Sequence, residues 1–237
     1  CSVVIHLAAP VGHDDYKTNY DVTVSGTENL IKACKRNNVR RIIFLSSVMA
    51  LIGQSNYGRT KLEAEKLLLR SGMDATILRG DWIYGDGDWG LSRLLRLIKK
   101  YPFIPIPGNG NYRKRPIYVD DAVKSLIGCM RRKETIGRLY MLGGPAITYN
   151  EMLETFCKAA GIRKRKVHLP MVIFFLAAAV AGLLGSRNIT KNNVLGLTFD
   201  CDYNIRKTKE LVNPIDFKDG LAKCKDYYQG ILQEQAH

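Results

Sequence analysis

The chain has 237 residues, enough for one large α/β domain or for a domain and a lobe. Of these residues 46% are hydrophobic and 24% are charged, which is usual for a soluble globular protein. Its net charge of +14 is high, yet the sequence contains neither an aromatic-rich RNA-binding motif nor zinc-finger spacing, so we expect no nucleic-acid partner. Six scattered cysteines without a Cys-x-x-Cys pair argue against a disulfide framework or a metal site and favour reduced thiols in the cytoplasm.

The first residues predict a buried strand. Residues 3–7 form an apolar run rich in β-branched side chains, which is typical of a parallel strand covered on both faces, and the run ends at Ala8-Ala9. Cys1 stands where a natural start would carry Met, and a buried strand is an unusual first element. We therefore expect the sequence to be a fragment whose N-terminal part is absent, so nothing follows about a secretory signal.

Strands and helices alternate through the first third of the chain. Apolar positions at helical spacing predict a helix at residues 24–34, and a second helix is predicted at residues 57–70, where Gly72 stops it. Short apolar runs at residues 42–45 and 75–78 predict strands. This β-α-β-α-β order implies right-handed crossovers, so we predict an α/β fold with a doubly wound parallel sheet.

Further along the chain the alternation is less regular. Residues 91–100 and 120–132 have helical patterns, and residues 138–142 have a strand pattern. Thr148-x-x-Glu151 is a capping-box motif, which predicts the start of another helix.

Residues 171–184 carry no charge. A membrane-spanning helix needs about 20 apolar residues, so this segment is too short to cross a bilayer. We predict a buried helix of a C-terminal lobe. The alternative is a helix that docks at a bilayer surface with the help of the basic residues 163–166, which would make residues 163–184 a peripheral membrane contact.

A serine pair and a tyrosine–lysine pair give the strongest signal for a site. Ser46-Ser47 ends a predicted strand, and Tyr57-x-x-x-Lys61 opens the next helix. Residues at this spacing lie on one helix face, so the Lys61 ammonium can approach the Tyr57 hydroxyl. A free tyrosine has a pKa of about 10, and a nearby cation lowers that pKa, which would make Tyr57 a usable general acid or base.

Spacing alone does not identify the site, because Tyr203-x-x-x-Lys207 has the same spacing. No serine-ended strand precedes Tyr203. Tyr57, in contrast, follows a buried strand tipped with hydroxyls at the carboxyl edge of a parallel sheet, where such folds bind their ligands. We therefore place the predicted catalytic centre at Tyr57 and Lys61.

A set of short motifs runs through the chain in a fixed order. The motifs are Val4-Ile5-His6-Leu7-Ala8-Ala9, Gly26-Thr27-x-Asn29-Leu30, Ser46-Ser47, Tyr57-x-x-x-Lys61, Leu78-Arg79 with Tyr84-Gly85, and Tyr118-Val119-Asp120-Asp121. In this order they resemble the extended short-chain dehydrogenases/reductases, a group that includes NAD-dependent sugar epimerases and dehydratases and the 3β-hydroxysteroid dehydrogenases. The resemblance covers nearly the whole chain and implies a Rossmann-type domain that binds NAD or NADP.

The resemblance also implies a division of the chain. Residues 1–144 would be the C-terminal part of the dinucleotide-binding domain, with segments of the substrate lobe within residues 86–118. Residues 145–237 would be mostly substrate lobe, smaller and mostly helical.

Carried over to this sequence, the catalytic residues of the family fall on Ser47, Tyr57 and Lys61. Tyr57 resembles the acid/base, and Lys61 resembles the residue that lowers the tyrosine pKa and holds the nicotinamide ribose. Ser47 matches the substrate-orienting hydroxyl better than Ser46, because the family's residue is usually the second of the pair.

Other family positions imply binding roles. Leu7, Ala8 and Ala9 resemble the strand-end loop that passes beneath the cofactor. Lys114 falls where the family often has an arginine facing a sugar-nucleotide phosphate. Trp82 is predicted to line the substrate pocket, with a role in covering the core as the alternative. We expect no metal at this site.

The sequence departs from the family pattern at several positions. The Gly-rich turn that cradles the cofactor pyrophosphate is absent, together with the first βαβ unit expected to carry it, so this chain alone is expected to bind the cofactor weakly. Thr23 replaces a frequent Asn, Gly80 replaces Pro, and Asp81-Trp82 replace a polar pair ending in Asn. Because of the last two differences, the identity of the substrate does not follow from the resemblance, and the chain resembles an atypical subfamily.

The predicted function is NAD(P)-dependent oxidoreduction or epimerisation of a secondary alcohol or ketone, with a nucleotide-sugar as the small-molecule substrate. A 3β-hydroxysteroid-dehydrogenase-like enzyme acting on an apolar or lipid-linked alcohol is the first alternative, motivated by residues 171–184. A non-catalytic, cofactor-binding assembly module is the second. We expect a cytoplasmic protein, with homodimerisation and peripheral membrane association as open alternatives.

Overall fold

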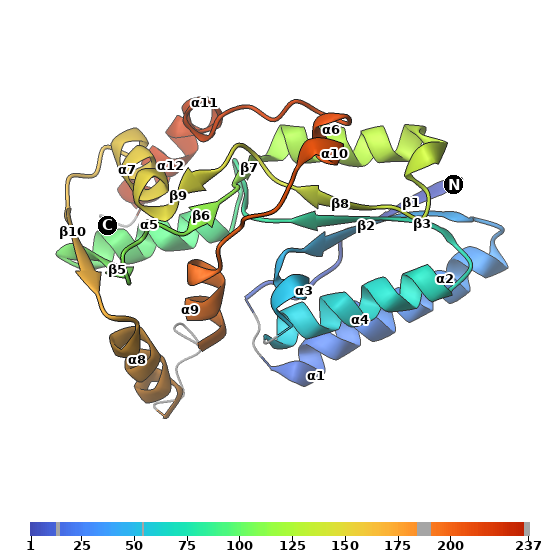
Figure 1. Cartoon of the computed structure of the whole chain (residues 1–237), viewed down its shortest axis with the longest axis horizontal. Coiled ribbons are helices and arrows are strands. Elements are labelled where there is room, and N and C mark those ends of the chain that lie inside the picture. The colour runs from blue at the N-terminus through green and yellow to red at the C-terminus, as the bar shows by residue number, and fades with distance from the viewer. Residues whose placement is uncertain (13–14, 54, 184–190, 235–237) are drawn as a thin grey trace. The chain divides into compact units, whose positions relative to one another are not determined.

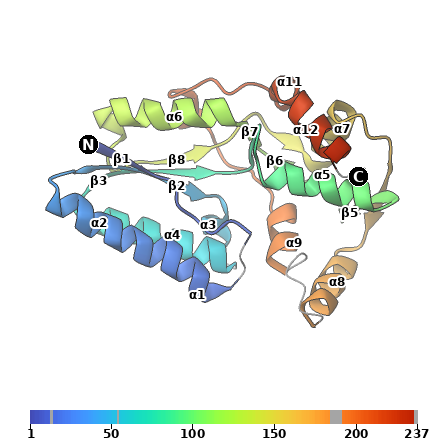
Figure 2. The same ribbon diagram turned by 180° about the vertical axis from the view of Figure 1, so that it is seen from behind.

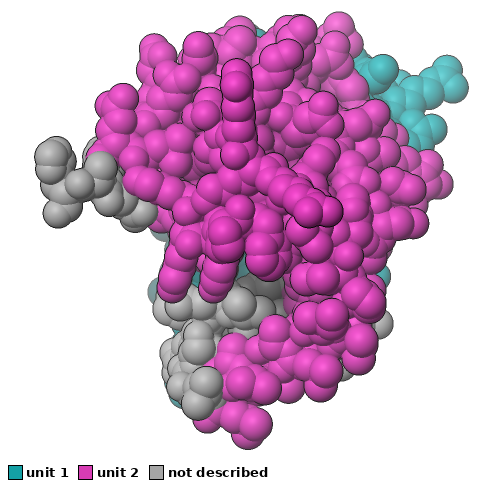
Figure 3. Space-filling model, turned by 90° about the vertical axis from the view of Figure 1, so that its left-hand side faces the viewer, with its two compact units in different colours: residues 1–80, 123–142, 204–212 teal, residues 81–122, 143–203, 213–237 magenta. Residues whose placement is uncertain are grey.

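The computed structural model describes residues 1–12, 15–53, 55–183 and 191–234. The chain divides into two compact units, which are coloured separately in Figure 3. Unit 1 comprises residues 1–80, 123–142 and 204–212, and unit 2 comprises residues 81–122, 143–203 and 213–237. Each unit is therefore built from separate stretches of chain.

Within the described part of unit 1, four strands form a parallel sheet in the order β1-β2-β3-β8. The strands are β1 (Val3–His6), β2 (Arg41–Ser47), β3 (Asp74–Gly80) and β8 (Leu139–Leu142). The register places His6 opposite Phe44 and Ser47 opposite Gly80. The carboxyl ends of β1, β2 and β3 therefore lie at one edge of the sheet, and the predicted α/β fold with a parallel sheet is confirmed.

Helices cover both faces of this sheet (Figures 1 and 2). One face carries α1 (Tyr16–Asn19), the π-helical turn η1 (Tyr20–Ser25), α2 (Gly26–Arg36), α3 (Met49–Ile52) and α4 (Asn56–Arg70), and the other carries α6 (Val119–Arg131) and α10 (Arg206–Lys209). The short 3-10 turn η2 (Lys133–Thr135) precedes β8. Buried side chains of β2, β3 and α4 form the core between them, among them Ile42, Phe44, Ile77, Ala64 and Leu68.

The helical segment before β2 begins earlier than predicted. The apolar pattern indicated a helix at residues 24–34, whereas the structure has continuous helical turns from α1 through η1 into α2. Asp15 caps this segment, because its side chain accepts a hydrogen bond from the backbone N–H of Thr18. The polar cap lies outside the apolar repeat on which the prediction depended.

The start of α4 is fixed by a cap and by a close approach of two backbones. The Ser55 side chain accepts a hydrogen bond from the backbone N–H of Gly58. A Cβ atom at Gly58 would clash with the carbonyl group of Met49 in α3. Glycine at this position therefore lets the first turn of α4 pack directly against α3.

Among the residues described for unit 2, the strands pair two by two. β4 (Ile83–Tyr84) pairs with β7 (Ile117–Tyr118) and β5 (Phe103–Pro107) with β10 (Arg165–Leu169) in parallel, while β6 (Arg113–Lys114) pairs with β9 (Ile147–Thr148) antiparallel. Helices α5 (Gly90–Lys100), α7 (Tyr149–Ala159), α11 (Phe217–Lys223) and α12 (Lys225–Glu234) contribute to a core that includes Tyr84, Phe156 and Tyr228. The predicted capping box of Thr148 and Glu151 is confirmed at the start of α7.

The apolar segment forms α8 (Met171–Leu183), which packs mainly against α9 (Lys191–Thr198). Val172, Leu176 and Val180 are exposed, so the prediction of a buried helix is wrong for residues 171–183, and residue 184 lies outside the described residues. The composition showed that the segment could fill a core, but α8 packs mainly against one short helix and leaves these side chains exposed. In the described part of the chain, no helix is long and apolar enough to cross a membrane.

Candidate active site

The predicted catalytic residues Ser47, Tyr57 and Lys61 lie together in unit 1. Ser47 ends β2, while Tyr57 and Lys61 occupy successive turns of α4. The side chains of Tyr57 and Ser47 are hydrogen bonded to each other. Two hydroxyl groups therefore meet at the carboxyl edge of the parallel sheet, where α/β proteins bind their ligands.

The pKa of Tyr57 shows one difference from the prediction. Burial raises this pKa to about 12, and the hydrogen bond with Ser47 acts in the opposite direction. The expected lowering by Lys61 is wrong for this structure, because the Lys61 ammonium is directed elsewhere. Its Nζ lies 4.7 Å from the centre of the Phe44 ring, against 5.9 Å for the Tyr57 ring, and donates to the Leu45 carbonyl at 2.9 Å.

Lys61 is almost fully buried, with 1% of its surface exposed. Burial lowers its pKa to about 8, and the nearby carboxylate of Glu65 opposes that shift. At neutral pH Lys61 is therefore mostly charged and Tyr57 is neutral. In this state Tyr57 holds a proton that it can donate.

A buried polar network lies beside these residues. Glu65 is on α4, one turn beyond Lys61, and its carboxylate accepts hydrogen bonds from Arg79 at 2.9 and 2.6 Å. Ser46 donates to the same carboxylate at 2.5 Å. The network ties α4 to the ends of β2 and β3, so it fixes the helix that carries Tyr57.

The end of β1 is held by a second set of buried groups. His6 Nε2 lies 2.9 Å from Thr27 Oγ1, and Thr27 donates to the Thr23 carbonyl at 2.5 Å. Burial and, to a smaller extent, the charge of Lys61 lower the pKa of His6 to about 4. His6 is therefore a neutral packed residue at neutral pH.

Leu7, Ala8 and Ala9 follow β1 at the same edge of the sheet. Leu7 and Ala8 are exposed and Ala9 is half-buried. An exposed strand-end loop at this edge can lie beneath a ligand bound at the carboxyl ends of the strands. The role of these residues in cofactor binding stays a prediction.

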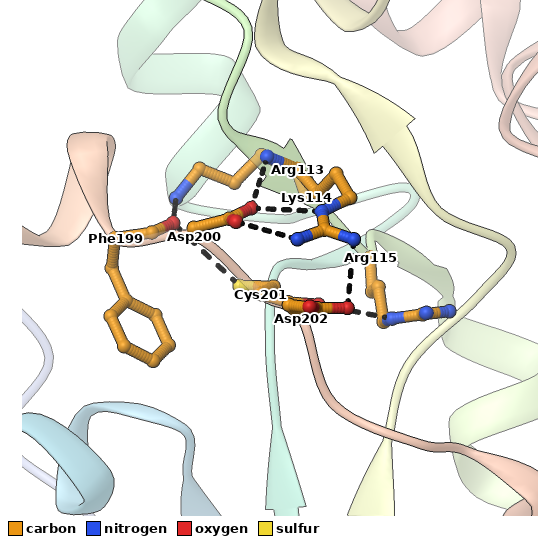
Figure 4. A network of polar contacts seen from close by, with 7 residues as sticks. All are labelled: Arg113, Lys114, Arg115, Phe199, Asp200, Cys201 and Asp202. Atoms are coloured by element: carbon orange, nitrogen blue, oxygen red, sulfur yellow. Dashed lines mark hydrogen bonds and ion pairs between the residues drawn. The ribbon is translucent and has the colours of Figure 1, made fainter.

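Lys114 lies in unit 2, where its side chain is buried in a network of polar contacts (Figure 4). Its Nζ donates to the carbonyl oxygens of Gly196 and Phe199 at 2.9 and 2.7 Å. Burial lowers its pKa, and the nearby Asp81 carboxylate opposes that shift. Lys114 therefore holds the end of α9 in this structure, and its predicted contact with a substrate phosphate stays a prediction.

The neighbours of Lys114 are also engaged by the segment after α9 (Figure 4). Arg113 forms ion pairs with Asp200 and Asp202, both at 2.8 Å. Arg115 Nε donates to the carbonyl oxygen of Cys201 at 3.1 Å. Residues 113–115 are thus an anchor for this segment.

Trp82 is also in unit 2. It is half-buried and packs against the unit 2 core, so part of its ring is covered and part is open. Its predicted role in a substrate pocket stays a prediction. Among the described residues, no group of three His, Cys, Asp or Glu side chains could hold a metal ion.

The motif order has a counterpart among known protein families. Residues 1–143 match the model of the NAD dependent epimerase/dehydratase family. The chain belongs to this family. The resemblance to extended short-chain dehydrogenases/reductases is thereby confirmed.

The curated relatives of this epimerase/dehydratase chain have names that denote different functions. It is 30% identical, over 75% of its length, to NADH dehydrogenase (ubiquinone) 1 alpha subcomplex subunit 9 of Arabidopsis thaliana and covers 45% of that protein. It is 29% identical, over 73% of its length, to UDP-glucose 4-epimerase of Vibrio cholerae and covers 61% of it. It is 32% identical, over 95% of its length, to 3beta-hydroxysteroid-dehydrogenase/decarboxylase isoform 1 of Arabidopsis thaliana and covers 62% of it. The chain thus spans less than two thirds of each relative.

Solved structures show the same fold. The UDP-glucuronic acid 4-epimerase of Bacillus cereus, in complex with UDP-glucuronic acid and NAD, has a TM-score of 0.73 at 21% identity, over 97% of this chain and 76% of that one. The UDP-glucose 4-epimerase of Thermotoga maritima with UDP-glucose has a TM-score of 0.74 at 21% identity, over 98% of this chain and 78% of that one. The Rossmann-type α/β fold is therefore confirmed.

Motif reasoning missed Glu65 in this epimerase/dehydratase chain. A signal was present, because Tyr57, Lys61 and Glu65 follow one another at the spacing of one helix face. Arg79, at the end of the adjacent strand, is the cation that pairs with the last of them. A carboxylate on a predicted buried face next to a strand-end arginine is a pattern that could have indicated the pair.

Proposed function

We propose that the protein is an NAD(P)-dependent oxidoreductase or epimerase that acts on a secondary alcohol or ketone of a nucleotide-sugar. The observation that carries the proposal is the hydrogen bond between Tyr57 and Ser47, one helical turn from the buried Lys61 ammonium. Family membership supports it, as does the similarity to UDP-glucose 4-epimerase. A structural neighbour was solved with both UDP-glucuronic acid and NAD.

The proposal places the dinucleotide cofactor at the carboxyl edge of the unit 1 sheet. Lys61 has three N–H donors and donates to one protein carbonyl, which leaves donors for a ribose hydroxyl. Leu7 and Ala8 are open at the same edge. When bound there, NAD or NADP would supply the acceptor for a hydride from the substrate carbon.

Tyr57 is proposed to exchange the proton of the substrate hydroxyl. The neutral form donates that proton when a ketone is reduced, and the tyrosinate accepts it when an alcohol is oxidised. With a pKa of about 12, the donating form predominates at neutral pH. The Ser47 hydroxyl would orient the substrate oxygen in the same exchange.

A tyrosine replacement tests this role. In the complete protein, Tyr57→Phe should lower turnover by about 100-fold or more, because general acid–base groups contribute about 10²–10⁴-fold. Steady-state turnover of UDP-hexoses provides the measurement. Tyr203→Phe, at the other Tyr-x-x-x-Lys spacing, is the matched control and should leave turnover unchanged. A loss below tenfold for Tyr57→Phe would exclude the acid/base role.

A steroid-like or other apolar alcohol is the second candidate substrate. The 32% identity to a 3beta-hydroxysteroid-dehydrogenase/decarboxylase over 95% of this chain favours it, and so does the exposed apolar helix α8. Turnover of a 3β-hydroxysteroid in place of a UDP-hexose would select this candidate. Absence of turnover with both substrate classes, together with retained cofactor binding, would select the non-catalytic assembly module. The similarity to an NADH dehydrogenase subunit favours this third candidate.

A further inference from the structure

Helix α8 presents an unusual amount of apolar surface for its length. Five of its large side chains are between 43% and 88% exposed: Val172, Ile173, Leu176, Val180 and Leu183. Figure 1 shows α8 beyond the end of β10 and beside α9. Single exposed apolar residues are normal on a protein surface, but a cluster on one helix marks a contact site.

The charge of the surrounding sequence is of one sign. Residues 155–199 contain no Asp or Glu and seven cationic residues, which are Lys158, Arg163, Lys164, Arg165, Lys166, Arg187 and Lys191. Four of these, Lys158, Arg163, Lys164 and Lys166, line a hollow of about 540 Å³ at the start of β10, together with Glu154. Positive charge therefore accompanies the apolar helix along the chain.

The cations before α8 differ in how they are engaged. The Lys164 ammonium donates to three carbonyl oxygens at the end of α5, and Lys166 pairs with Glu154 at 3.0 Å. Arg163 and Arg165 are exposed, and no ion pair is present for them among the described residues. These two guanidinium groups are available to an external anion.

We propose that α8, together with Arg163 and Arg165, docks unit 2 on an anionic lipid bilayer. At about 1.5 Å per residue, the 13 residues of α8 extend about 20 Å, too little to cross a hydrocarbon core of about 30 Å. The helix would instead lie at the interface, with its apolar side chains among the acyl chains and Arg163 and Arg165 near the lipid phosphates. A second copy of this chain is a poorer partner, because it would bring the same positive segment.

Vesicle binding tests the proposal on the 237-residue chain. Flotation with vesicles of phosphatidylcholine alone and of phosphatidylcholine with phosphatidylserine compares neutral and anionic surfaces. We expect at least tenfold tighter binding to the anionic vesicles, and weaker binding as salt rises, since exposed charges are screened. Equal affinity for the two surfaces, or binding to neither, overturns the proposal.

Replacement of apolar side chains tests the helix itself. Leu176→Ser with Val180→Ser should weaken binding to the anionic vesicles by at least about tenfold, because both side chains would leave the acyl region. Leu69→Ser with Val123→Ser changes two equally apolar exposed side chains of unit 1 and should have no effect. Equal losses from the two pairs would contradict docking through α8.

Replacement of charges tests the basic residues. Each Lys or Arg near an anionic membrane contributes about 1 kcal/mol, or roughly fivefold in affinity, so Arg163→Gln with Arg165→Gln should weaken binding by about 25-fold. Lys35→Gln with Arg36→Gln removes the same charge from α2 and serves as the control. A similar loss in the control would mean that net charge, and not this segment, attracts the bilayer.

Two further measurements keep the test decisive if a variant folds poorly. Hydrogen exchange of the wild-type chain with anionic vesicles should slow within residues 165–183, and slowing only elsewhere contradicts the proposal. Sedimentation without lipid should show no association that depends on α8. Association lost in Leu176→Ser with Val180→Ser, without vesicle binding by the wild-type chain, would replace the bilayer by a second copy.

Discussion

At the scale of single residues, the buried ion pair between Glu65 and Arg79 ties α4 to the end of β3. Their side chains are 3% and 12% exposed. Removing one partner leaves a buried charge without compensation, so Arg79→Leu should lower the free energy of unfolding by about 3–5 kcal/mol. Glu65→Leu with Arg79→Leu should lose much less. Urea denaturation gives both values.

The control for this pair is an exposed one. Lys17 and Asp21 form an ion pair on the surface, and Asp21→Ala should leave stability nearly unchanged. If the double replacement of Glu65 and Arg79 costs as much as the single replacements added together, the two side chains do not act as a pair.

His6 predicts a dependence of stability on acid pH. Its pKa is about 4 in the folded chain, against 6.5 for an unperturbed histidine. As the pH falls from 6.5 to 4, the unfolded chain gains a proton on His6 that the folded chain does not, so stability falls in that window by about 3 kcal/mol. Above pH 6.5 the neutral histidine carries no such penalty.

Urea denaturation at pH 7 and at pH 4.5 measures this effect. His6→Gln should remove the contribution of His6 and so lose less stability between the two pH values than the wild-type chain. His168→Gln replaces an exposed histidine of β10 and should follow the wild-type chain. Identical pH dependence of His6→Gln and wild type would contradict the neutral buried state of His6.

At the scale of elements, the contact between α3 and α4 positions Tyr57. Gly58→Ala would gain about 1 kcal/mol of helix propensity on an exposed helix, but the added Cβ would clash with the Met49 carbonyl. We expect the first turn of α4 to move away from α3, with loss of the Tyr57–Ser47 hydrogen bond and at least tenfold lower turnover.

Gly26→Ala is the matched replacement, because a Cβ there would lie 3.8 Å from the Asp21 carbonyl oxygen, an ordinary contact. This variant should keep turnover and gain stability slightly. Turnover and circular dichroism of both variants are the measurements. Wild-type turnover in Gly58→Ala would show that the close approach of α3 and α4 has no catalytic consequence.

The elements of unit 1 could be predicted because each carries its own local signal. β2 is marked by a short apolar run and the end of α4 by Gly72, and the family motifs indicate Ser47, Tyr57 and Lys61 as site residues. The direction of the Lys61 ammonium could not be predicted, since it depends on the position of the Leu45 carbonyl in β2. The exposure of α8 could not be predicted either, because an apolar sequence does not show whether other helices or strands cover the helix it forms.

At the scale of the whole molecule, the chain passes from one unit to the other several times. The sequence predicts mostly substrate lobe for residues 145–237, and within this range residues 204–212 belong to unit 1. In that segment α10 packs against β8, and Arg132 donates to the Glu210 carbonyl at 2.7 Å. Nothing local marks this return, since it depends on contacts between residues far apart in the chain.

The return of the chain to unit 1 is tested at Thr208. Its side chain is fully buried, and its hydroxyl donates to the Met141 carbonyl of β8 at 2.7 Å. Thr208→Val keeps the shape but removes the donor, so it should cost about 1–3 kcal/mol and speed hydrogen exchange in β3 and β8. Thr198→Val is the control, because the Thr198 hydroxyl bonds within its own helix α9. Faster exchange confined to unit 2 in Thr208→Val would show that residues 204–212 do not support the sheet that carries the candidate site.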